Sequence, residues 1–133
     1  MNMSTNIQPA FAGGAVTMIH GKTRRFRFQV QDRITGFGTD VSGWSSFRFL
    51  CKTNVADADG SAVIAKTLGS GITAVQAASG LMEILISPAD TASLNDVGIH
   101  LFAELQGVDP ASLPWSLWQG ELDIQPTVVQ ASN

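Results

Sequence analysis

Arg25-Phe26-Arg27-Phe28-Gln29-Val30-Gln31 alternates strictly between polar and apolar side chains. A period of two belongs to a half-buried β-strand, because successive side chains of a strand point to opposite faces of the sheet. The same period recurs in residues 46–53 and again in residues 118–124. The sequence therefore predicts a protein built from short strands.

Shorter candidate strands lie between these segments, and residues that tolerate positive φ separate them. The candidates are 16–20, 63–67, 72–75, 81–86 and 99–106, with turns at 57–60, 69–71 and 79–80. Eight short strands at this spacing predict an all-β fold, an antiparallel sandwich or barrel. The expected core consists of Phe26, Phe28, Val30, Phe47, Phe49, Cys51, Ile84, Ile86, Leu101, Trp118, Leu122 and Ile124.

One short helical turn is predicted near residues 88–94. Ser87 can cap it, Pro88 suits its first turn, and Asp90 places a negative charge near the free amides at its start. Gly98 and the strand after it limit the helix to one or two turns. We interpret it as a connector between two strands.

The 133 residues fit a single domain with one core. Residues 1–14 and 126–133 show no periodicity, so we expect an N-terminal arm (1–14), a β-sandwich domain (15–125) and a C-terminal tail (126–133). The arm lacks the basic start and apolar run of a signal peptide. The chain also lacks an apolar run of about 18 residues, so we expect no membrane span.

Composition limits the classes of partner. The formal net charge is −3, whereas phosphate binding normally needs a basic excess, so we expect no nucleic-acid partner. Charged residues make up 14% of the chain, against about 25% in ordinary soluble domains. So few charges suggest that neighbours cover part of the surface.

Several motifs occur in a characteristic order along the chain, and the most specific are the helical turn and the closing strand. The order is an alternating strand, 40–44, a second strand, 63–67, 71–73, 78–80, a strand ending at Ile86, the turn 87–94 and the closing segment 119–126. It resembles the immunoglobulin-like domain of phage virion proteins of the baseplate-upper-protein type. The resemblance covers roughly residues 16–129.

The resemblance implies an antiparallel immunoglobulin-like β-sandwich and a non-enzymatic structural role in a bacteriophage tail, baseplate or neck. Its partners would be other virion proteins and further copies of itself. The chain would be made in the host cytoplasm and end in the virion. The sequence stops at Asn133, without the stalk or receptor-binding module of larger relatives, which favours an adaptor, collar or capsid-decoration role over host recognition.

Candidate partner-binding residues lie in the arm, in the basic strand and near the C-terminus. They are Ile7, Pro9, Phe11, Arg25, Arg27, Trp115, Val128 and Val129. Arg25 and Arg27 should project from the face opposite Phe26 and Phe28. They could meet an acidic neighbour, although a solvated face that discourages aggregation is the simpler interpretation. We expect flexible ends to order on contact with neighbours.

No catalytic or metal site is predicted. Residues 57–60 begin like a calcium loop, but the residues that follow supply no further carboxylate, so we interpret them as a plain turn. Cys51 is the single cysteine and belongs to the predicted core. His20 and His100 form no recognisable nucleophile or zinc motif. We therefore expect no cofactor and no enzymatic activity.

The tryptophans raise an alternative, a carbohydrate-binding or host-adhesion module. Alternation directs Trp118 into the core, and Trp44 should close one end of the sandwich. Trp115 follows Pro114 in an expected loop and should be the most exposed of the three. The chain has no tyrosine, which is a favoured residue at such surfaces. A sugar-binding role would require an exposed tryptophan pair.

Overall fold

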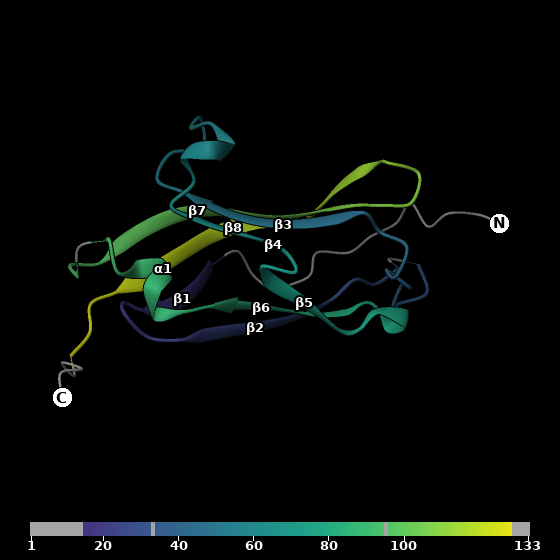
Figure 1. Ribbon diagram of the computed structural model, residues 1–133, viewed down its shortest axis with the longest axis horizontal. Helices are drawn as coiled ribbons and strands as arrows, with labels where there is room; N and C mark the ends of the chain where they lie inside the picture. The colour runs from purple at the N-terminus through teal and green to yellow at the C-terminus, as the bar shows by residue number, and fades with distance from the viewer. Residues whose placement is uncertain (1–14, 33, 95, 129–133) are drawn as a thin grey trace.

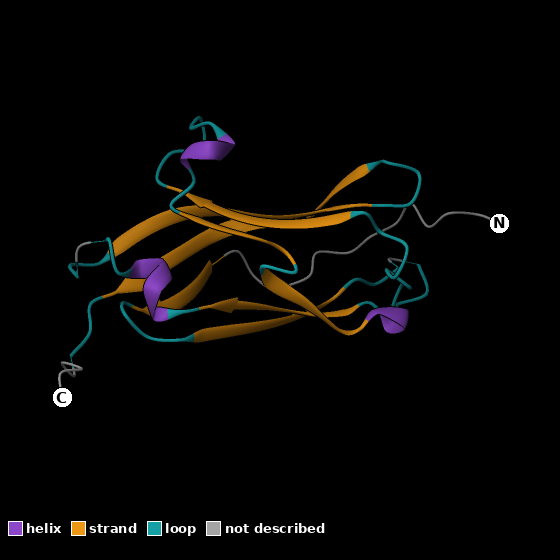
Figure 2. Ribbon diagram, in the orientation of Figure 1, coloured by secondary structure: helices purple, strands orange, loops and turns teal. Residues whose placement is uncertain are grey.

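The computed structural model describes residues 15–32, 34–94 and 96–128, which form eight strands and three short helical segments (Figure 1; Figure 2). The strands are β1 (Ala15–Ile19), β2 (Arg24–Gln29), β3 (Ser46–Lys52), β4 (Ile64–Leu68), β5 (Gly71–Gln76), β6 (Leu81–Ile86), β7 (Ile99–Val108) and β8 (Pro114–Gln125). The helical segments are η1 (Asp59–Ser61), η2 (Ala77–Ser79) and α1 (Pro88–Thr91). The predicted all-β class is confirmed.

The strands belong to one hydrogen-bonded sheet in the order β1-β8-β7-β3-β4-β5-β6-β2. The sheet curls over itself, so that β8, β7, β3 and β4 lie above β5, β6 and β2 in Figure 1. The chain crosses between the two layers in the bend from β4 to β5, where Gly69 and Gly71 take φ values of 87° and 99°. Residues with a side chain rarely adopt such φ angles, which explains the glycines at this bend.

The sequence predicted an antiparallel sheet, but the observed sheet also contains parallel pairings. Five of the strand pairings in the described residues are antiparallel, whereas β1–β8 and β4–β5 are parallel. The β4–β5 pairing arises because the strand bends between the layers without reversing its direction. No hairpin joins β1 to the distant β8, so nothing requires these two strands to run in opposite directions.

Alternating side chains from both layers form the core. All twelve residues of the predicted core are at most 7% exposed, so that prediction is confirmed. Rings of β2 contact rings of β3 across the layers, with centroids 6.4 Å apart for Phe26 and Phe49 and 6.3 Å apart for Phe28 and Phe47. These contacts hold the two halves of the curled sheet together.

The predicted helical turn is present as α1. The backbone N–H of Ser87 donates to the Asp90 carboxylate at 2.7 Å, and Lys66 from β4 reaches the same carboxylate at 2.7 Å. Burial raises the pKa of Asp90, but these polar partners outweigh it and hold the pKa below its usual 3.8. The turn is therefore tied to the sheet. Within the described ranges, no helix is long and apolar enough to cross a membrane.

Gly80 tests the fold directly, because it has φ +77° and an added Cβ would lie 2.6 Å from the carbonyl oxygens of Val30 and Thr39. Gly80→Ala should lower the free energy of unfolding in urea by about 2–4 kcal/mol, through left-handed backbone strain and overpacking. Gly60→Ala is the matched control, since nothing lies within 4 Å of its added Cβ. Equal stability of the two variants would contradict this account.

Candidate interaction surfaces

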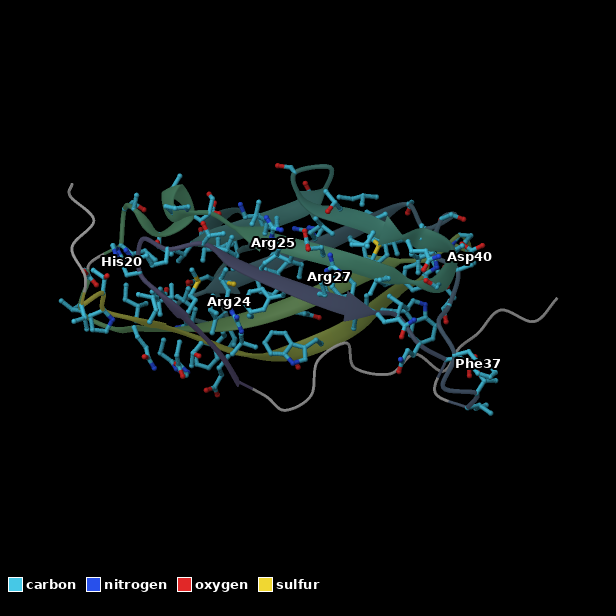
Figure 3. All side chains as sticks on the ribbon, turned by 90° about the horizontal axis from the view of Figure 1, so that it is seen from below. His20, Arg24, Arg25, Arg27, Phe37 and Asp40 are labelled. Carbon is cyan, nitrogen blue, oxygen red and sulfur yellow. The ribbon has the colours of Figure 1, made fainter. Side chains whose placement is uncertain are left out.

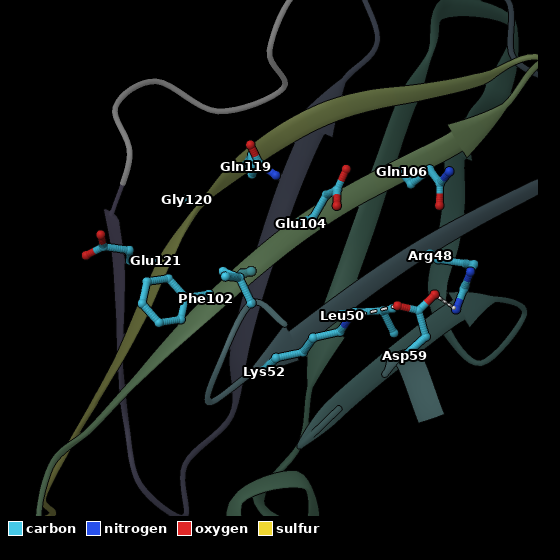
Figure 4. A pocket seen from close by; sticks show the side chains of 12 residues that line it. Arg48, Leu50, Lys52, Asp59, Phe102, Glu104, Gln106, Gln119, Gly120 and Glu121 are labelled. Atoms are coloured by element: carbon cyan, nitrogen blue, oxygen red, sulfur yellow. Dashed lines mark hydrogen bonds and ion pairs between the residues drawn. The ribbon is translucent and has the colours of Figure 1, made fainter. Parts of the chain in front are cut away.

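A groove of about 550 Å³ lies on the outer face of β3, β7 and β8 (Figure 4). Phe47, Phe49 and Cys51 of β3 point into the core, so the residues between them point outward. Strand register places Leu50 beside Glu104, and Glu104 beside Gln119. The next row consists of Lys52, Phe102 and Glu121. The groove thus has an apolar side chain next to a charged one at its centre.

The loop between β3 and β4 borders the groove and is fixed to it by ion pairs. Asp59 accepts hydrogen bonds from Lys52 at 2.7 Å and from Arg48 at 3.2 Å. The hydrogen bond from Lys52 is the main reason that the pKa of Asp59 lies below its usual value. Because two cations already occupy this carboxylate, residues 57–60 act as a structural turn. In the described part of the chain, no group of three or more metal-ligating side chains is placed to hold a metal ion.

The other end of this face is acidic. His100 on β7 contacts Asp123 through Nδ1 and Glu121 through Nε2, and its ring meets the ring of Phe102 edge-on at 5.4 Å. The two carboxylates lie at opposite nitrogens of the imidazole, so they cannot share a single metal ion with it. Glu104 has no ion pair with any of the described residues. This surface was missed at the sequence level, although the outward alternation of residues 100–106 was its signal.

The opposite layer presents a basic outer face (Figure 3). The Arg25 and Arg27 side chains are each 62% exposed, which confirms that they point away from Phe26 and Phe28. Both approach Glu83 of β6, Arg27 at 3.2 Å and Arg25 at 3.9 Å. Two arginines therefore share one carboxylate, and Arg25 is the more loosely held.

A third exposed feature is the loop between β2 and β3, whose Ile34 and Phe37 are 78% and 75% exposed. Hydrogen bonds connect the described residues of this loop. The Asp32 carboxylate accepts from the backbone N–H groups of Ile34 and Thr35, and the N–H of Asp32 donates to the carbonyl oxygen of Phe37 at 2.9 Å. The loop therefore presents two apolar side chains from a defined backbone.

The prediction that Trp115 lies in a loop is wrong, whereas the prediction that it is the most exposed of the three tryptophans is confirmed. Trp115 belongs to β8 and is half-buried, because its indole N–H donates to the buried Asp109 at 3.0 Å. Trp118 is buried, as predicted, and Trp44 is buried as well, with its ring stacked on that of Phe47. The three tryptophans therefore do not form the exposed pair that the sugar-binding alternative requires.

Of the remaining predicted partner-binding residues, one lies within the described part of the chain and the others do not. Val128 is 93% exposed and available to a partner. The candidates Ile7, Pro9, Phe11 and Val129, and with them the whole arm 1–14, lie outside the described residues.

The single cysteine and the first histidine are engaged in structural contacts. Cys51 is fully buried, and burial raises the pKa of its thiol to about 12, which keeps it protonated at neutral pH and unsuited to nucleophilic chemistry. His20 contacts the carbonyl oxygen of Leu94 at 2.7 Å through Nε2. This contact links the β1–β2 turn to the segment after α1.

Comparisons with known proteins give little for this chain. No family model and no curated protein matches it. Among solved structures, it is similar to murine CRIg, with a TM-score of 0.42 and 10% identity over 86% of this chain and 93% of that one. A similarity at this level carries no argument about family or function.

Asp109 gives a pH-dependent prediction for the β7–β8 turn. Its pKa lies below the usual 3.8, first because of the Trp115 indole and then because of backbone N–H groups, so its stabilising effect is present above 3.8 and disappears as the pH falls through the folded-state pKa. Trp115→Phe should lower the urea midpoint at neutral pH. The difference from the unmodified protein should shrink in acid, and a difference that stays constant with pH would contradict this role.

Proposed function

We propose that this chain is a non-enzymatic structural component of a bacteriophage virion, in the tail, baseplate or neck. It would dock on neighbouring virion proteins and on further copies of itself. The resemblance to phage immunoglobulin-like domains motivates the proposal. The helical turn and the closing strand, which carry the most specific part of that resemblance, are α1 and the second half of β8.

The architecture supports the finer assignment of an immunoglobulin-like sandwich. The curled sheet places β2 and β6 against β3, β7 and β8, with the rings of Phe26, Phe28, Phe47 and Phe49 between them. Two facing layers with an alternating apolar interior are what such a sandwich requires. The two parallel pairings are the features that an antiparallel sandwich does not predict.

The observation that carries the proposal is the placement of the chemically active side chains. They lie on open outer faces, where most are neutralised by one another, as in the contacts of Asp59 with Arg48 and Lys52 and of Glu83 with Arg27. Turnover needs a poised nucleophile or acid–base group at a bound substrate. An open surface on which apolar side chains lie beside charged ones suits docking to another protein.

The exposed loop and the chain ends would add to this docking surface. Ile34 and Phe37 are exposed, and the backbone N–H groups of Ile34 and Thr35 already donate to Asp32, so holding these described residues in place on contact would cost little entropy. Val128 is exposed near the C-terminus. We include Ile7, Pro9, Phe11 and Val129 in the proposal on the strength of their sequence alone.

The experiment is to purify intact phage particles from the source of this chain and analyse their proteins by mass spectrometry. The chain should be present in fixed proportion to the known tail proteins, and gold-labelled antibodies should mark the tail, baseplate or neck. Labelling of the capsid surface would overturn the tail placement in favour of decoration. A chain that is abundant in the lysate and missing from the particles would overturn the virion role.

A further inference from the structure

The two outer faces of the molecule carry opposite charge. On β2, the basic face presents Arg25 and Arg27 with Glu83 as their shared carboxylate, whereas the guanidinium of Arg24 lies over the Phe26 ring, 4.8 Å from its centroid. The acidic face consists of the outward side chains of β3, β7 and β8 and the loop that borders them. It carries Arg48, Lys52, Asp59, Glu104, Glu121 and Asp123, which are two cations and four carboxylates.

Within the acidic face the charges are unevenly paired. Arg48 and Lys52 both bind Asp59 at one side of the groove, so they do little to neutralise the carboxylates on β7 and β8. Glu104, at the centre of the groove, forms no ion pair inside the described structure (Figure 4). A half-buried carboxylate left in this state favours an incoming cation, and most of all a guanidinium group.

Apolar side chains accompany the charges on both faces. Leu85 lies directly opposite Arg25 on β6, and Val75 on β5 is 43% exposed. The groove contributes Leu50, Val55 and Phe102. Each face therefore combines a few apolar side chains with a net charge, which is positive on the basic face and negative on the acidic face.

We propose that the basic face of one copy docks into the groove on the acidic face of a second copy, with Arg25 of the first approaching Glu104 of the second. This inference rests on the proposed function, and it identifies a second copy of the chain as one of the partners. The two faces look away from each other across the core, so they cannot meet within one molecule (Figure 1; Figure 3). The contact is head-to-tail and builds a ring or a row of copies.

Charge reversal in the full-length chain tests the contact. Light scattering and sedimentation should show concentration-dependent oligomers at low salt, and these should weaken as NaCl rises from about 0.05 M to about 0.5 M. Arg25→Glu and Glu104→Arg should each weaken self-association by about tenfold or more. The double variant should recover it, because every contact then holds the reversed pair. Asp40→Lys, at one end of the molecule, alters the net charge as Glu104→Arg does and should leave association unchanged.

Circular dichroism of each variant checks that the fold is retained. A monomer at every concentration and salt level, single variants that associate normally, or a double variant that fails to recover would each overturn this contact. These outcomes leave the proposed function intact if the chain is still found in purified particles. Absence from particles together with salt-sensitive, charge-reversible self-association would instead overturn the virion role and support the contact.

Discussion

The ring contacts between β2 and β3 are the constraint on which the rest of the molecule depends. Phe26 meets Phe49 and Phe28 meets Phe47 across the two layers, and this fixes which residues of each strand face inward. Because side chains alternate, the residues between them must face outward. The positions of Arg25 and Arg27 on one face and of Arg48, Leu50 and Lys52 on the other thus follow from the packing of four rings. A slip of one residue in either strand would bury the cations and expose the rings.

The sequence predicted the strands and the core well because alternation is a local signal. The sequence-based prediction of a loop at Trp115 was wrong, because β8 contains a bulge. The register between β7 and β8 shifts near Leu105, and Leu117 and Trp118 are both buried although they are neighbours in sequence. An extra residue reverses the alternation upstream of it, so Trp115 turns toward the core and Asp109 instead of toward solvent. Pro114 had suggested a loop, but proline is tolerated at the first position of a strand.

The parallel pairings and the groove could not be predicted for a different reason, since both depend on which strands become neighbours. Alternation places Leu50, Glu104 and Gln119 on outer faces, but the cross-strand register decides that they form one row. The same holds for Asp59, which becomes the partner of Arg48 and Lys52 once the loop folds back over β3. Such contacts join distant parts of the chain, and no short pattern encodes them.

The charged residues are few and unevenly distributed, so that the two outer faces of the molecule carry opposite net charge. Only 14% of residues are charged, and several of these form ion pairs that stabilise the fold, such as Lys66 with Asp90. What remains is acidic around Glu104 and His100 and basic along β2, on opposite sides of one rigid core. Two like faces of such a molecule would repel each other across a symmetric contact, whereas unlike faces attract. A fold with this arrangement is therefore better suited to ordered, directional rows than to a closed face-to-face dimer.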